Sequence, residues 1–151
     1  MEPQITTLVS QRPGGVVAFS QGGAFYNMQN SRGYLLHFTI TARANAWYRL
    51  VFNGFVQSTV GQVPQWADFY WVGSPGSSPS TSGAILGGAN TPMGAFTGNV
   101  GATCYGLSAP VGAGQYTFTL AASLSHSTQT AGAQVIGLYC ASVEDIGWRY
   151  F

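Results

Sequence analysis

Charge is scarce in this sequence. Only 6% of its 151 residues are charged, and these are five arginines and four acids, with no lysine. Ordinary globular proteins carry about a quarter charged residues, and isolated soluble domains use that charge to stay apart from one another. The composition therefore predicts a protein that works inside an assembly, with a monomer of uncharged polar surface as the alternative.

Several classes of function lack the residues that they need. The formal net charge of +1, without a local arginine cluster, provides no electrostatic footprint for nucleic acid. The longest apolar runs, such as 16–19, are far too short to span a membrane. The N-terminus, MEPQITTLVSQRPGG, lacks the basic and apolar regions of a signal peptide, and the chain contains no N-x-[ST] acceptor. We expect no nucleic-acid partner, no membrane partner and no secretion.

The two cysteines, Cys104 and Cys140, have neither CxxC spacing nor a nearby histidine. A structural zinc site needs about four ligands, which this pattern does not supply. We expect two free thiols that serve as small buried hydrophobes, with a disulfide as the alternative. No metal and no cofactor is expected.

Helix signals are absent, because helix formers are few and 21 glycines interrupt the chain. Period-two alternation takes their place. In segment 34–43 Leu36, Phe38 and Ile40 share one face, and segment 47–53 alternates in the same way. A short break separates the two segments, so a hairpin between them is expected.

Two later segments show the same alternation. Residues 115–124 alternate most cleanly, and residues 134–143 are largely apolar on both faces, as in a central strand covered on both sides. Many short strands separated by Gly and Pro turns indicate an all-β domain, either a sandwich or a barrel.

Two regions break this pattern. Residues 1–14 have no strong periodicity, and residues 73–114 hold eleven Gly and four Pro. A structureless stretch of the second length is unusual in a compact domain, so short strands are expected near 84–86 and 103–107. We assign 1–14 to an N-terminal arm and 15–151 to one domain with a Gly/Ser/Pro-rich insertion at about 73–114.

The adjacent acidic residues near the C-terminus do not have the pattern of a catalytic pair. Glu144 and Asp145 are adjacent, and neighbouring side chains of a strand project to opposite faces. They would then not converge on one substrate atom, as a paired-carboxylate site requires. Glu2 and Asp68 are the other two acids and lie far away in sequence. A carboxylate enzyme is not expected.

Other catalytic patterns are missing as well. The inventory alone permits a Ser-His-Asp triad, since His37, His126 and many serines are present, but there is no GxSxG elbow. There is also no GxGxxG loop and no acid cluster for calcium. We expect no enzymatic activity, and we expect His37 on the outward face of its strand.

The aromatic residues are numerous, with four Trp, eight Tyr and nine Phe. The segment PQWADFYWVG is hard to bury completely, because Trp66, Phe69, Tyr70 and Trp71 cannot all face one side of a strand. Exposed aromatics serve protein contact or stack on sugar rings. Three interpretations of this segment remain: its aromatics are all buried in the core, they form an oligomer contact, or they form a carbohydrate site.

The C-terminal quarter carries a resemblance. APVGAGQYTFTLAASLS, followed by QVIGLYCASVEDIG, resembles the last two strands of trimeric jelly-roll domains in structural proteins of tailed bacteriophages. The arrangement is also similar to the tumour-necrosis-factor and C1q class of jelly rolls. The resemblance implies a jelly-roll sandwich of two antiparallel sheets, with an extended N-terminal arm.

The resemblance also implies a function. Short length and low charge favour a capsid decoration (cement) protein, a homotrimer on the capsid exterior, made in the host cytoplasm, whose partners are itself and the major capsid protein. The alternative is a tail or receptor-binding module that recognises host surface glycans. Glu144 and Asp145 would accept hydrogen bonds from loop backbone or pair with arginine, and Arg149 is close in sequence. The three terminal aromatics would anchor the tail to this subunit or a neighbour. The expected interaction residues are Ile5, Leu8, Val9, Trp66, Tyr70, Trp71, Trp148, Tyr150 and Phe151.

Overall fold

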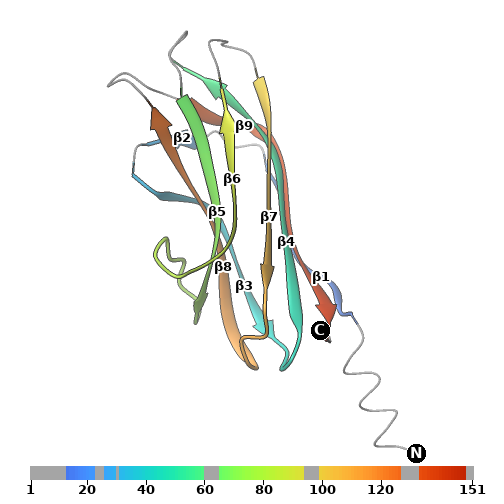
Figure 1. The fold of residues 1–151 in the computed structure, drawn as a ribbon. Coiled ribbons are helices and arrows are strands. Elements are labelled where there is room, and N and C mark those ends of the chain that lie inside the picture. Colours follow the sequence, from blue (N-terminus) through green and yellow to red (C-terminus); the bar gives the residue numbers. More distant parts are fainter. Residues whose placement is uncertain are drawn as a thin grey trace, which may run out of the picture.

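The computed structural model of this chain describes residues 13–22, 26–29, 31–59, 65–93, 99–126 and 133–148. Every regular element in those ranges is a strand (Figure 1). The strands are β1 (Gly15–Gly22), β2 (Tyr26–Met28), β3 (Gly33–Ala42), β4 (Trp47–Ser58), β5 (Gln65–Pro75), β6 (Ala84–Pro92), β7 (Asn99–Ser108), β8 (Gly114–His126) and β9 (Ala133–Gly147).

The strands form two antiparallel sheets. The five-stranded sheet has the order β1-β9-β4-β7, with β2 also pairing with β9, and the four-stranded sheet has the order β3-β8-β5-β6. Pairs form between the first strand and the last (β1 with β9), then inward through β3 with β8, β4 with β7 and β5 with β6. This nested pairing is a hairpin of strands rolled into two sheets, which is the jelly roll. The predicted all-β jelly-roll sandwich is confirmed.

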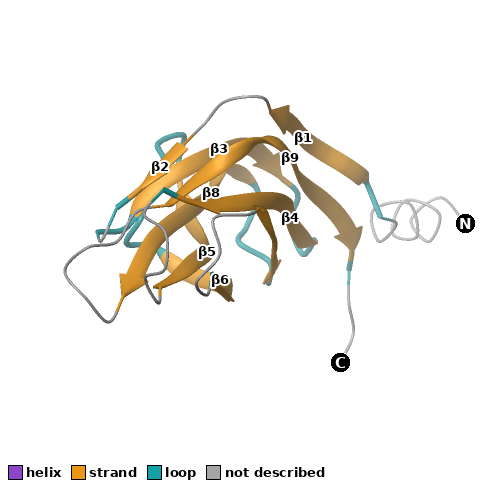
Figure 2. Cartoon of the chain, turned by 90° about the horizontal axis from the view of Figure 1, so that it is seen from above, coloured by secondary structure: helices purple, strands orange, loops and turns teal. Residues whose placement is uncertain are grey.

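The core lies between the two sheets, and the alternation in the sequence places it there. Tyr48, Leu50 and Phe52 of β4 are fully buried, as are Phe118 and Leu120 of β8. Burying a side chain of this size stabilises the fold by roughly 1.5–3 kcal/mol. Figure 2 views the sandwich from above, with β3, β8, β5 and β6 to one side of β1, β9 and β4.

The expected hairpin between residues 34–43 and 47–53 is wrong. β3 belongs to the four-stranded sheet and β4 to the five-stranded sheet, so the chain crosses between sheets at residues 43–46. The turn contains Asn45 in the left-handed region, with φ of 63°. Crossing lets Ile40 of β3 and Leu50 of β4 enter the same core from opposite sides, which pairing within one sheet would not allow.

β9 is central, as predicted, because it pairs with β1 and β2 on one side and with β4 on the other. Only one of its faces enters the core, where Val135, Ala141 and Val143 are buried. The opposite face, with Cys140, Ser142 and Glu144, is half-buried. The prediction that both faces of this strand are covered is therefore wrong within a single chain.

Residues 73–114 are part of the sandwich itself. They contain β6 and β7, which extend the two short strands expected near 84–86 and 103–107. The two sheets approach closely here, because a Cβ at Gly87 of β6 would lie 2.0 Å from the backbone oxygen of Tyr105 in β7. The indole N–H of Trp71 donates to the carbonyl of Cys104 at 3.0 Å across the same junction.

The loop that follows β5 lies on the outer face of the four-stranded sheet. The hydroxyl of Thr117 donates to the carbonyl of Gly76 at 2.7 Å, and the N–H of Ser80 donates to the hydroxyl of Thr119 at 3.2 Å. Both threonines point away from the core and are nevertheless buried. The Ser/Pro-rich loop therefore covers part of this face, so its backbone polar groups find partners in the strand threonines.

Candidate interaction surface

The adjacent acids Glu144 and Asp145 project to opposite faces of β9, as expected. The Asp145 side chain is 2% exposed and accepts two hydrogen bonds from the Arg43 guanidinium, at 2.7 and 2.9 Å. Glu144 lies on the outer face and pairs with Arg49, whose side chain is 56% exposed. Because the two carboxylates face apart and each has an arginine, they do not form a paired-carboxylate site.

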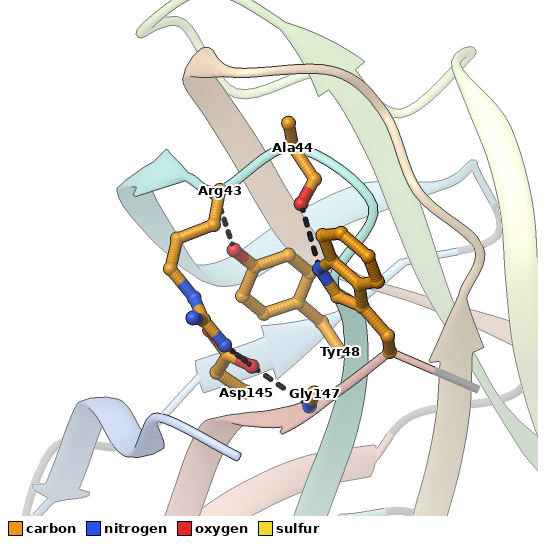
Figure 3. A network of polar contacts seen from close by, with 6 residues as sticks. Arg43, Ala44, Tyr48, Asp145 and Gly147 are labelled. Carbon is orange, nitrogen blue, oxygen red and sulfur yellow. Dashed lines mark hydrogen bonds and ion pairs between the residues drawn. The ribbon is translucent and has the colours of Figure 1, made fainter. Parts of the chain in front are cut away.

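The Asp145 network joins the end of β9 to the crossing between β3 and β4 (Figure 3). The N–H of Gly147 donates to Asp145 at 2.9 Å, and the backbone N–H of Arg43 donates to the hydroxyl of Tyr48 at 2.8 Å. The indole N–H of Trp148 donates to the carbonyl of Ala44 at 3.2 Å. The buried acid therefore joins the end of β9 to the corner between the sheets.

The electrostatics of Asp145 agree with this role. Burial raises its pKa, but the hydrogen bonds from Arg43 and from the N–H groups of Gly147 and Gly14 outweigh burial, and the pKa lies below its ordinary value. The carboxylate is therefore held ionised at neutral pH. A general acid would need the opposite shift.

The outer face of the five-stranded sheet presents its side chains in rows that run across the strands. One row, which we call the aromatic row, consists of Phe19, Ser142, Val51 and Tyr105 in register from β1 to β7. The next row toward the Asp145 end has the ion pair Arg49–Glu144 at its centre, flanked by Val16 and Leu107.

Most of the exposed large hydrophobic side chains lie on strands of this sheet. Among the described residues, eight large hydrophobic side chains are exposed, and six of them lie on β1, β4 and β7. Phe19 and Tyr105 in the aromatic row are 61% and 62% exposed. Contiguous exposed apolar side chains mark interaction sites more often than scattered ones. The six are Val16, Val17, Phe19, Phe55, Tyr105 and Leu107.

A groove of about 650 Å³ lies beside the aromatic row on the same face. Its walls include Phe55, Tyr139 and the Asn53–Thr103 pair, in which the Thr103 hydroxyl donates to Asn53 at 2.9 Å. Gly101 leaves the groove open, because a Cβ built there meets no atom within 4 Å. The other small residues that line the groove are Gly22, Gly54, Ala102 and Cys140.

The outer face of the four-stranded sheet is occupied differently. The Arg32 guanidinium lies 4.3 Å from the centre of the Tyr70 ring and donates to the carbonyl of Thr81 at 3.3 Å. A Cβ at Gly88 would lie 3.2 Å from the same ring, so the Tyr70 side chain packs over this glycine. Arg32 therefore holds the loop after β5 against this sheet, through a cation–π contact and a hydrogen bond.

Asp68 also lies on this second face. Its carboxylate is buried and accepts hydrogen bonds from the amide of Asn90 and the hydroxyl of Ser125. Among the described residues, no group of three or more His, Cys, Asp or Glu is placed to hold a metal ion. The described part of the chain contains no helix long and apolar enough to cross a membrane.

The structure places the predicted interaction residues in different environments. Trp71 is fully buried and faces the core together with Phe69, so the prediction of Trp71 as a contact residue is wrong. The physical reason is alternation, because Trp66 and Tyr70 take the outward positions of β5 and are half-buried. Trp148 is half-buried at the Asp145 network. Ile5, Leu8, Val9, Tyr150, Phe151 and the expected acid partner Arg149 lie outside the described residues.

Sequence reasoning missed Phe19, Tyr105 and the groove. The alternation of segment 99–108 offered a signal, since Tyr105 and Leu107 fall opposite Ala102 and Cys104. The groove offered none, because it combines glycines from strands that are distant in sequence. His37 is exposed on β3, as predicted.

The two thiols lie on different faces of the five-stranded sheet. Cys104 is fully buried, and burial raises its pKa to about 11. Cys140 lines the groove on the outer face. Both are free, and their opposite orientations agree with the predicted absence of a bond between them.

No family model and no curated protein matches this sequence. Among solved structures, the chain is similar to the enzymatically active domain of bacteriophage CBA120 tailspike protein 4, at 13% identity and a TM-score of 0.27, over 81% of this chain and 19% of that one. The chain is also similar to a glycoside hydrolase family 43 arabinoxylan arabinofuranohydrolase from Bacillus subtilis, in complex with cellotetraose. That match has 16% identity and a TM-score of 0.29, and it covers 93% of this chain and 28% of the other.

A structure of infectious bursal disease virus, Gx strain, gives 14% identity and a TM-score of 0.28, over 91% of this chain and 42% of that one. The chain thus spans less than half the length of each of these structures. At such low scores the likenesses carry no argument about function, which rests on the side chains described above.

Proposed function

We propose that this chain is a structural protein of a tailed-bacteriophage particle, and that it acts as a homotrimeric decoration protein on the outside of the capsid. The observation that carries the proposal is the outer face of the five-stranded sheet, where exposed apolar side chains surround an internally paired charge. A contiguous apolar face of this kind marks a surface that another protein covers.

Two further features support the proposal. Only 6% of the residues are charged, which suits a protein that is packed among other subunits. The segment from Ala109 to Gly147, which carries the resemblance to phage jelly rolls, contains the whole of β8 and β9. In this proposal the partners are further copies of the chain and the major capsid protein.

Immunogold labelling of intact virions, with antibodies against this chain, tests the proposed location. We expect label over the whole head, and no binding of the purified protein to a glycan array. Label confined to the tail tip, or specific glycan binding, would favour the receptor-binding module instead. For that alternative, Trp71 does not provide an exposed ring for stacking on a sugar, because its side chain is buried.

A further inference from the structure

We propose that copies of this chain associate through the outer face of the five-stranded sheet, and that the aromatic row of one copy enters the groove of the next. The inference rests on the proposed assembly function, and it adds which face makes the contact and which residues fit together. The occupant of the face is therefore a second copy of this chain.

The projecting part of the contact is the aromatic row. Phe19 and Tyr105 stand at its two ends, on β1 and β7, and more than half of each side chain is exposed. Large aromatic side chains dominate the energetics of protein interfaces because they bury much area with few rotatable bonds.

The receiving part is the groove in the adjacent row. A Cβ built at Gly101 meets no atom within 4 Å, so the space above this glycine is open to an incoming side chain. Phe55 offers an apolar wall, while Asn53, which accepts from Thr103, has an amide group that can meet a tyrosine hydroxyl. The groove therefore suits an aromatic side chain that bears a polar end.

The charges of this face favour a neutral partner. Arg49 and Glu144 pair with each other at the centre of their row, so an approaching copy meets no unmatched charge from them. When two copies meet, therefore, neither charge of this ion pair is left without its partner. A strongly charged partner would find little electrostatic attraction on this surface. A second copy of the same neutral face meets both conditions.

The size of the face also fits an interface between copies. The β4–β7 ladder has ten paired positions, so the four main strands cover on the order of 600 Å² in flat projection, at about 3.3 Å per residue and about 4.8 Å per strand. Side-chain relief brings the accessible area of the whole face toward roughly 800 Å², which is what one partner buries in a standard interface, and in a ring two neighbours share this face.

The separation of row and groove permits a ring. Two copies that meet about a two-fold axis place each row in the other's groove, whereas a contact in one direction only, from the row of one copy to the groove of the next, is heterologous and closes into a ring when the rotation permits. The trimer expected from the sequence is the smallest ring of this kind. The opposite sheet is a poorer candidate, because its own loop and Arg32 cover it.

Sedimentation velocity on the full chain and three variants tests the inference. Tyr105→Ser removes a projecting ring, and Gly101→Val fills the groove where the structure has open space. Tyr34→Ser is the matched control, since Tyr34 is 53% exposed on the other sheet. We expect a wild-type trimer at micromolar concentration, at least a tenfold weaker association for the first two variants, and wild-type association for the control.

Alkylation of Cys140 without denaturant provides a second readout. We expect the trimer to protect Cys140, which lines the groove, and Tyr105→Ser to expose it. A wild-type chain that stays monomeric, or Tyr105→Ser and Gly101→Val variants that both sediment as the wild type, would overturn the inference. Circular dichroism checks that each variant is folded. If Gly101→Val does not fold, the sedimentation of Tyr105→Ser alone tests the inference.

The outcomes separate this inference from the proposed function. If face variants become monomeric while virions carry no label on the head, the self-association holds and the decoration role fails. If the variants remain trimeric but no longer attach to capsids, the face belongs to the shell, and the self-association inference fails instead.

Discussion

Asp145 and Arg43 lie 102 residues apart in the chain and form a two-pronged ion pair, with one carboxylate oxygen on each of two guanidinium nitrogens. Asp145 stands at the end of the last strand, and Arg43 stands where the chain crosses from one sheet to the other. The pair therefore ties the two sheets together at the end of the sandwich where β1 begins and β9 ends (Figure 1).

Asp145→Asn should destabilise the folded chain by about 2 kcal/mol, because hydrogen bonds to a charged group contribute on the order of 1.5–3 kcal/mol. In thermal unfolding this corresponds to a decrease in Tm of about 4–8 °C. The neighbouring Glu144→Gln is the control, and we expect a change below about 1 kcal/mol because its ion pair is exposed. Equal losses in both variants would contradict this assignment.

The same carboxylate should make stability depend on pH. Its pKa is lowered by folding, so its contribution is complete above the unfolded pKa of about 3.9 and is lost as the pH falls through the lower folded value. Denaturant unfolding between about pH 5 and pH 2 should therefore show a steeper loss in the wild type than in Asp145→Asn. Parallel curves would show that other groups cause the acid sensitivity.

Gly87→Ala should destabilise the sandwich by about 3 kcal/mol, because the added methyl group meets the backbone of β7 and neither sheet can yield without losing contacts. The built Cβ lies 2.0 Å from the Tyr105 oxygen. Gly101→Ala, whose Cβ meets nothing within 4 Å, is the control. Chemical unfolding compares the denaturant midpoints of the two variants at equal oligomeric state. Similar midpoints would show that the spacing between β6 and β7 accommodates a methyl group at residue 87.

Cys104 should not react with iodoacetamide at pH 8 in the folded chain. Its pKa of about 11 leaves only about one thousandth of it as thiolate at that pH, and the side chain is fully buried. In a Cys140→Ser background, intact mass should show no adduct before denaturation and one adduct afterwards, without reductant. An adduct on the native chain would mean that β7 opens readily.

Deletion of residues 1–12 should leave the jelly roll folded, with an unchanged circular dichroism spectrum, and should weaken capsid attachment or capsid heat resistance. The sequence offers Ile5, Leu8 and Val9 as a short apolar stretch, which we expect to add as a strand to a neighbour. The cut spares Gly14, whose N–H bonds to Asp145. A truncated chain that protects capsids as well as the full one would remove this role from the arm.

The sequence alone determined the class of fold. Residues 47–53 and 115–124 alternate with period two, and a strand projects successive side chains to opposite faces, so their apolar positions had to face a common core. The same local rule separated Glu144 from Asp145 and predicted that no paired-carboxylate site would form. It also implied that the four aromatics of residues 66–71 would divide between two faces, although it did not say which two would be buried.

Only the tertiary structure decided which strands are neighbours and what their outer faces carry. Segments 34–43 and 47–53 have the pattern of a hairpin, yet they enter different sheets, because one core is enclosed from both sides. The partners of the acids are Arg43 and Arg49, which lie far away in sequence. The groove beside Tyr105 forms from glycines of β1, β4 and β7, since strand register brings together side chains that no local pattern relates.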